Sequence, residues 1–169
     1  MTETLFGPAL VEEATKKSGL IWVRGDAPAA RALWHVWHEG AAHVVGDGPG
    51  EQPLPGLVAG STAEVTVRSK DKGGRIVAWT AAVTELAPGT QEWDAAVAEL
   101  KGKRLNATDG EAMPERWARE CRVLRLEPRD STTDLPDGSL AAVPRASDAT
   151  TRRAVPAALP RLLFKRRKR

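Results

Sequence analysis

The stretch that decides the fold is ALWHVWHEGAAHVVGD, residues 32–47. Two β-prone runs flank Glu39-Gly40, and a two-residue loop of this kind is typical of a β-hairpin. The register that follows pairs Trp37 with Ala42, Val36 with His43, His35 with Val44 and Trp34 with Val45. One face then carries Trp34, Val36, His38, Ala41, His43 and Val45, and the other carries Leu33, His35, Trp37, Ala42 and Val44. Neither face is polar.

A hairpin that is apolar on both faces must be covered on both faces. One face can line the interior of a barrel, so the other face needs a second layer. For a domain of this size we favour a second copy of the chain, which predicts a homodimer with aromatic residues at its interface. The alternative is that helices of the same chain cover the second face.

The segments around the hairpin alternate like antiparallel strands, with too few helices for a parallel sheet. A helix is expected over 8–18. A second helix follows the N-cap Thr90, with Trp93, Val97, Leu100 and Arg104 on one stripe, and a helical turn begins at Pro114. The expected strands are 20–25, 32–38, 41–47, 63–69, 75–86 and 121–127. The sequence therefore predicts a mainly β fold, a six-stranded antiparallel barrel with peripheral helices.

Composition divides the chain of 169 residues into one domain and a tail. After residue 128 the sequence is rich in Pro, Ser, Thr and Asp and has few branched apolar residues. We therefore predict a folded domain over 5–128 and a disordered tail over 129–169. Residues 145–169 hold nine Lys/Arg and one acid, a charge of +8, which leaves −5 for residues 1–144. The basic pI belongs to the tail.

Several classes of protein are excluded at this stage. No apolar run approaches the ~20 residues of a membrane-spanning helix, and the first residues do not resemble a secretory signal. The single cysteine, Cys121, leaves no intramolecular disulfide, so we predict a cytoplasmic protein. No metal site is predicted, because His35 lies on the opposite hairpin face from His38 and His43.

The order of elements and several residues resemble the FMN-binding split-barrel family. This family includes pyridoxamine 5'-phosphate oxidase-like proteins and actinobacterial flavin/deazaflavin reductases. The matching segments are Ser18-Gly19-Leu20 after the first helix, IWVR (21–24), RALWHVWHEG (31–40), AEVTVRS (63–69) and RIVAWTAAV (75–83). The likeness covers residues 8–127 and is a pattern of elements more than a strict motif.

The resemblance implies a split β-barrel that forms a homodimer with a cofactor in each interface cleft. The cofactor would be FMN, or alternatively a deazaflavin coenzyme or none, and the reaction an oxidation or reduction of a small substrate. One segment departs from the family. Many members hold the cofactor phosphate with Arg and Lys after the third strand, whereas the matching GDGPGEQPLP (46–55) has no cation.

The densest basic cluster of the domain is RSKDKGGR, residues 68–75, at a predicted hairpin tip. An anion site needs positive charge and a backbone free to turn, which Gly73-Gly74 provide. The residues predicted to hold the phosphate are Arg68, Ser69, Lys70 and Arg75. The alternative is a solvated hairpin tip, because charged turns are common.

His35 and Trp37 are the candidate contacts to the cofactor ring. His35, between Trp34 and Trp37, would be a hydrogen-bond donor in a ligand cleft, or alternatively a buried histidine with a structural partner. No catalytic side chain is assigned, because a cofactor can carry the chemistry itself.

Two other functions stay open. The chain would be a non-catalytic split-barrel ligand-binding or interaction protein that has lost the cofactor, a hypothesis that the cation-free segment 46–55 favours. The basic tail, ending in FKRRKR (164–169), would contact anionic lipid or nucleic acid weakly, or serve only to keep the chain soluble.

Overall fold

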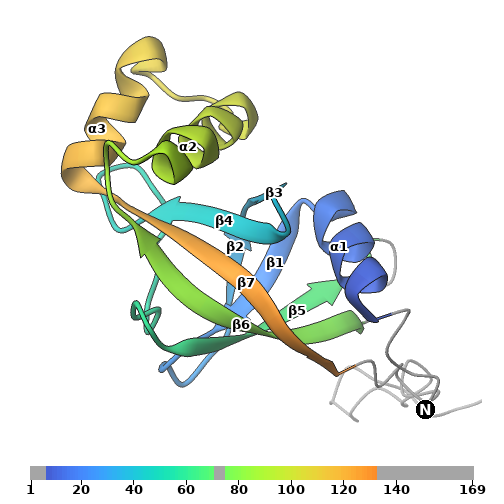
Figure 1. The fold of residues 1–169 in the computed structure, drawn as a ribbon. Coiled ribbons are helices and arrows are strands. Elements are labelled where there is room, and N and C mark those ends of the chain that lie inside the picture. Colours follow the sequence, from blue (N-terminus) through green and yellow to red (C-terminus); the bar gives the residue numbers. More distant parts are fainter. Residues whose placement is uncertain (1–6, 71–74, 133–169) are drawn as a thin grey trace, which may run out of the picture.

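The computed structural model describes residues 7–70 and 75–132, which form a nearly closed antiparallel β-barrel with three α-helices (Figure 1). The strands are β1 (Leu20–Arg24), β2 (Arg31–Trp34), β3 (Val36–His38), β4 (Ala41–Gly46), β5 (Thr62–Arg68), β6 (Arg75–Leu86) and β7 (Arg122–Thr132). The helices are α1 (Gly7–Lys17), α2 (Gln91–Lys103) and α3 (Met113–Glu120), the last preceded by a 3₁₀ turn over Gly110–Ala112. The mainly β barrel with peripheral helices is thus confirmed.

The two edges of the sheet are joined by the chain itself. All seven strands belong to one sheet in the order β2-β1-β5-β6-β7-β4-β3, so the two edge strands are consecutive in sequence. One residue, His35, separates them. The described residues therefore hold seven strands where six were predicted, because the expected strand over 32–38 divides at His35.

The predicted hairpin register is confirmed only next to the turn. Val36, Trp37 and His38 of β3 pair with His43, Ala42 and Ala41 of β4. Before His35 the chain changes partner, and Trp34 pairs with Leu20 of β1. The predicted pairs of Trp34 with Val45 and His35 with Val44 are therefore wrong, because β2 completes the opposite edge of the sheet.

Gln52 bridges the gap that this change of partner leaves. Its side-chain Oε1 accepts a hydrogen bond from the Trp34 amide at 2.9 Å. Its Nε2 donates to the carbonyls of Trp34, at 2.9 Å, and Val45, at 3.2 Å. A side-chain amide thus supplies backbone partners at the point where β2 and β4 do not pair with each other.

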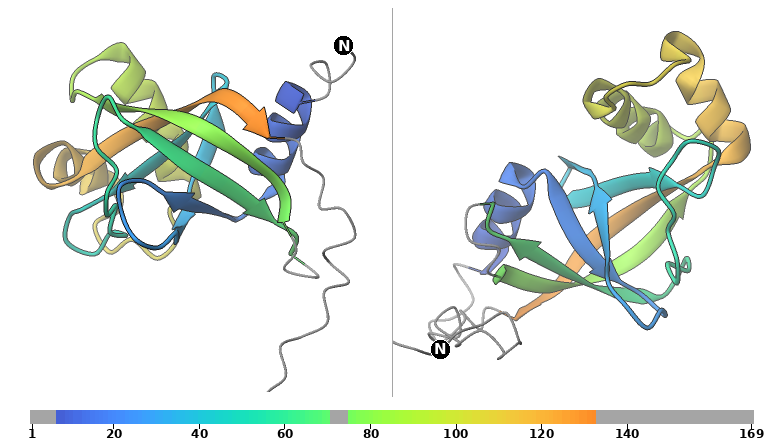
Figure 2. Two further views of the ribbon diagram at one scale, coloured as in Figure 1. Left: turned by 90° about the horizontal axis from the view of Figure 1, so that it is seen from below. Right: turned by 180° about the vertical axis from the view of Figure 1, so that it is seen from behind.

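The two hairpin faces belong to two cores. Leu33, Ala42 and Val44 lie in the barrel interior, together with Trp79 from β6. Val36 and Val45 face outward, into a second core formed with α2 and α3. These helices lie together on one side of the barrel, as Figure 2 shows from two further directions. The predicted division between the faces is confirmed for these five hairpin residues.

The second face is covered by this chain's own helices. Trp93, Val97 and Leu100 of α2 and Trp117 of α3 are all buried there. As predicted, Thr90 caps α2, because its Oγ1 accepts a hydrogen bond from the Trp93 amide at 3.3 Å. The buried residues of α2 and α3 confirm the alternative prediction, in which helices of the same chain cover the second face of the hairpin. The homodimer remains a prediction, but the need to cover the second hairpin face no longer supports it.

The last strand runs to Thr132, past the domain end predicted at residue 128. The predicted tail lies outside the described residues from 133 onward. No helix in the described part of the chain is long and apolar enough to cross a membrane.

We expect Gln52→Ala to lower the free energy of unfolding by about 2–3 kcal/mol, because it leaves three partly buried backbone groups without a partner. Urea unfolding at neutral pH measures the change. Gln91→Ala, at an exposed first position of α2, is the control and should change stability by under about 0.5 kcal/mol. Equal stability of the two variants would contradict the bridging role.

Candidate functional site

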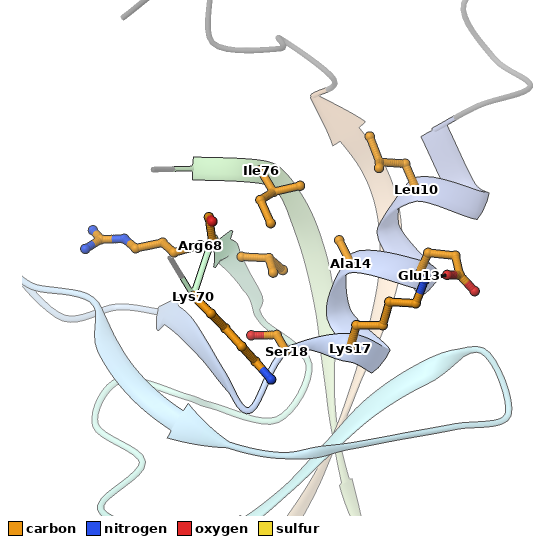
Figure 3. Close-up of a pocket in the computed structure, with 10 residues that line it drawn as sticks. Leu10, Glu13, Ala14, Lys17, Ser18, Arg68, Lys70 and Ile76 are labelled. Carbon is orange, nitrogen blue, oxygen red and sulfur yellow. Dashed lines mark ion pairs between the residues drawn. The ribbon is translucent and has the colours of Figure 1, made fainter. Parts of the chain in front are cut away.

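A cleft of about 410 Å³ opens between α1 and the ends of β5 and β6 (Figure 3). Its apolar wall includes Leu10 and Ala14 of α1 and Ile76 of β6. Arg68, Ser69 and Lys70, three of the four residues predicted to hold a phosphate, line it together. Arg75 pairs with Arg68 in the β5–β6 ladder, but its side chain lies outside the described part of the chain.

The three cations at this cleft differ in what already engages them. The Arg68 guanidinium lies 4.3 Å from the centre of the Trp22 ring and points away from α1 (Figure 3). Lys17 forms an ion pair with Glu13 at 2.6 Å. Lys70 extends toward Ser18 and, among the described residues, has no carboxylate within ion-pair distance. Lys70 is therefore the cation whose charge is available to a ligand.

His35 is fully buried at the corner between β2 and β3. Its Nε2 donates a hydrogen bond to the Thr15 carbonyl, in the last turn of α1, at 2.8 Å, since a carbonyl can only accept. Burial lowers the pKa of His35 to about 4, so the ring is neutral at physiological pH. His35 is therefore a buried histidine with a structural partner, which was the alternative interpretation of this residue. Its contact with a cofactor remains a prediction.

Trp37 lines a different cleft from the basic residues. Its half-buried ring meets Trp79 edge-on, with ring centres 6.3 Å apart. The cleft, of about 510 Å³, lies between β3 and α2. Lys16 lines this cleft and Lys17 lines the first, so the last turn of α1 stands between them. The six predicted site residues are thus not gathered in one cleft.

The segment 46–55 contains no cation, but two arginines from the helices reach it. The carboxylate of Glu51 is completely buried. It accepts hydrogen bonds from Arg104, at the end of α2, from Arg116 of α3, and from the indole of Trp117, each at 3.1 Å. The loop is therefore fixed to the second core by a buried carboxylate.

These two arginines are matched by two carboxylates. Arg116 also pairs with Asp109 at 2.5 Å. The Arg116 guanidinium lowers the pKa of Asp109, and its carboxylate partners raise the pKa of Arg116. A cleft of about 380 Å³ lies beside them, but its arginine charges are already balanced. The sequence contained one signal for this cluster, because Arg104 falls on the apolar stripe of α2.

The histidines of the hairpin do not form a metal centre with neighbouring ligands. The rings of His38 and His43 are 6.0 Å apart, between centres. Burial, with a smaller contribution from Arg125, lowers the pKa of His43 to about 4. In residues 7–70 and 75–132, no group of three or more His, Cys, Asp and Glu is placed to hold a metal ion.

Comparison with known proteins shows the fold. No family model and no curated protein matches the chain. The heme storage protein HutZ of Vibrio cholerae aligns over 71% of this chain and 88% of its own, with 12% identity and a TM-score of 0.52. An F420 reductase aligns over 72% and 94%, with 14% identity and a TM-score of 0.50. A Bacteroides thetaiotaomicron protein, named as a candidate 5-nitroimidazole antibiotic resistance protein, aligns over 78% and 82%, with 8% identity and a TM-score of 0.51. The chain shares the split-barrel fold of these structures.

We expect acid to destabilise the protein between pH 6.5 and 4. The unfolded chain binds protons at His35 and His43 below pH 6.5, whereas the folded chain does so only near pH 4. The stability that the neutral rings contribute is therefore complete above 6.5 and lost as the pH falls. The loss between pH 7 and 4.5 is about 2 kcal/mol for each histidine.

Urea unfolding of the wild type and of His43→Gln at pH 7 and 4.5 measures this dependence. The variant should show a pH difference smaller by about 2 kcal/mol, since one of the two groups no longer titrates. An identical pH difference in both proteins would show that His43 is not the group responsible.

We expect Glu51→Gln to lower the free energy of unfolding by about 3 kcal/mol, because it leaves two arginines facing a neutral group in a buried setting. Glu111→Gln is the matched control. Glu111 pairs with Lys101 at 2.6 Å but is 96% exposed, so its loss should cost under about 0.5 kcal/mol. Thermal or urea unfolding distinguishes the two variants, and similar effects would contradict a stabilising role for the buried Glu51 carboxylate.

Proposed function

We propose that the chain is a flavin-binding oxidoreductase of the split-barrel type, acting on a small substrate as a homodimer. The observation that carries the proposal is the cleft beside α1, where the available charge of Lys70 stands at one end and apolar side chains at the other. The F420 reductase of similar fold supports a flavin-type cofactor. FMN is the cofactor we propose, with a deazaflavin coenzyme as the alternative.

The cleft has the properties that an FMN-sized ligand requires. Its volume of about 410 Å³ falls within the usual range of small-molecule sites. Lys70 and the hydroxyl of Ser69 would hold the phosphate, because an ammonium and a hydroxyl both donate to phosphate oxygens. Leu10, Ala14 and Ile76 would pack against the apolar part of the cofactor. Arg68 would join the phosphate only by leaving the Trp22 ring.

The chain's own residues would bind and orient the cofactor. A bound flavin supplies hydride or electron transfer, so the protein needs no acid or base for that step. The apolar wall would exclude water from the ring. The side chain of Ile76 is exposed on this wall. A second copy of the chain would cover it in the proposed homodimer.

A second function is favoured by a specific observation. At segment 46–55, where members of the resembling family hold the phosphate, Arg104 and Arg116 are already balanced by Glu51 and Asp109. A non-catalytic ligand-binding protein would retain the barrel without that phosphate site. HutZ, described as a heme storage protein, has a similar fold.

We expect the full chain to bind FMN, and Lys70→Met to weaken FMN binding by about tenfold or more, the value of one charge-assisted hydrogen bond. Calorimetric titration with FMN and with riboflavin, which lacks the phosphate, measures the effect. Riboflavin affinity should be the same in both proteins. Lys101→Met is the control, because Lys101 is paired with Glu111 and lies outside the cleft.

Absence of FMN or deazaflavin binding at high micromolar concentration would overturn the proposal. Flavin binding without enzymatic reduction or reoxidation of the bound cofactor would favour the non-catalytic function instead. Equal loss of FMN and riboflavin binding in Lys70→Met would contradict the phosphate role of Lys70.

A further inference from the structure

The backbone of Trp37 is open on one side of β3. The turn after β3 has positive φ angles at Glu39, of 45°, and Gly40, of 72°, which are typical of a two-residue type I′ turn. Residue pairs next to such a turn alternate between hydrogen-bonded and non-hydrogen-bonded pairs. His38 and Ala41 flank the turn and form the first kind, so Trp37 and its partner in β4 form the second. The N–H and C=O of Trp37 therefore point away from β4.

These two backbone groups have no partner in the part of the chain that the structure describes. β3 is an edge strand, and β4 is its neighbour in the sheet. In residues 7–70 and 75–132, neither the N–H nor the C=O of Trp37 takes part in a hydrogen bond with another element. Trp37 is the middle one of the three residues of β3, so this edge offers one donor and one acceptor side by side.

The cleft of about 510 Å³ lies at this edge, and α2 forms one of its walls. Ala98 and Gly102, one turn apart on α2, line that wall with small residues. A side chain at Gly102 would meet no other atom within 4 Å of its Cβ. Glycine inside a helix costs about 1 kcal/mol relative to alanine, and here it leaves space for a ligand opposite β3.

The charges of this cleft favour an anion. Lys16 and Lys103 line it, and neither has a carboxylate within ion-pair distance among the described residues. Glu99 of α2 is the acid in the described lining, which leaves a surplus of one positive charge. Burial lowers the pKa of Lys103, and the charge of Lys70 lowers it further. A carboxylate beside Lys103 would offset both effects, because an opposite charge stabilises the protonated amine.

We propose that this cleft binds a small N-acyl amino acid. The amide N–H of the ligand would donate to the C=O of Trp37, and a carboxylate oxygen would accept from the Trp37 N–H, as in a hydrogen-bonded antiparallel pair. Lys16 and Lys103 would stabilise the carboxylate, and the acyl group would lie along the wall of Ala98 and Gly102. A free amino acid suits the cleft less well, because its ammonium would add a third positive charge.

The test titrates the ¹⁵N-labelled full chain with three probes, followed by NMR. Hippurate (N-benzoylglycine) has both the amide and the carboxylate, 3-benzoylpropanoate has CH₂ in place of the amide N–H, and hippuramide has a neutral amide in place of the carboxylate. We expect hippurate to bind about fivefold more tightly than 3-benzoylpropanoate and about tenfold more tightly than hippuramide. Hippurate should shift the amide resonance of Trp37 and leave that of Val65, which is paired on both sides, unchanged.

Two double variants separate a ligand contact from a general effect of helix-end lysines. Lys16→Met with Lys103→Met should remove the preference for hippurate over hippuramide. Lys17→Met with Lys101→Met is the matched control and should keep it, because these lysines of the same two helices are paired with Glu13 and Glu111 and do not line the cleft. Gly102→Leu should weaken the binding of all three probes without lowering the free energy of unfolding, since leucine favours a helix more than glycine does.

The inference does not depend on the flavin proposal, because Trp37, Lys16 and Lys103 do not line the cleft beside α1 and the titrations contain no flavin. An unchanged Trp37 amide resonance at saturating hippurate, or equal affinity for hippurate and 3-benzoylpropanoate, would overturn the backbone contact and with it the inference. Failure of hippurate to bind at millimolar concentration, or equal effects of the two double variants, would overturn it too.

Discussion

The structure depends on the way one residue joins the two edges of its sheet. His35 lies between Trp34, the last residue paired with β1, and Val36, the first residue paired with β4. Two contacts hold this corner: the hydrogen bond from His35 to the Thr15 carbonyl of α1, and the bridge from Gln52 to Trp34 and Val45. The corner thus fixes the first helix and the loop after β4 relative to the barrel.

The same corner determines which side chains line the clefts. It sends Trp34 and Trp37 to different edge strands and brings the ends of α1 and α2 close to both. The helix ends carry lysines, and Lys70 extends from the tip of β5 toward the end of α1. Charge and aromatic surface therefore gather at one end of the molecule. At the segment 46–55, by contrast, the charges are balanced within the chain.

The sequence predicted most of the fold because the informative signals were local. The Glu39-Gly40 turn, the alternation over 63–69 and the cap at Thr90 each depend on neighbours in the chain, and all three are found in the structure. The division at His35 was not predicted. An apolar run predicts one strand whether it pairs with one neighbouring strand or with two in succession. The change of partner at His35 depends on where β1 and β4 lie, and the local sequence does not contain that information.

The candidate site was predicted only in part, for a similar reason. The basic tip was visible as a cluster in sequence, and the structure gathers Arg68, Ser69 and Lys70 in one cleft. The Glu51 cluster joins residues 51, 104, 109, 116 and 117. Such a long-range set of contacts leaves almost no local trace.

The brevity of β2 and β3 has a consequence for how the protein behaves among other copies of itself. These terminal strands hold four and three residues, and they are continuous through one corner. Exposed backbone at the rim of a sheet is a template on which foreign strands can add, and a short template supports few ladder bonds. The two short edge strands of the described barrel can therefore form few hydrogen bonds with a strand of another molecule, which disfavours edge-to-edge aggregation.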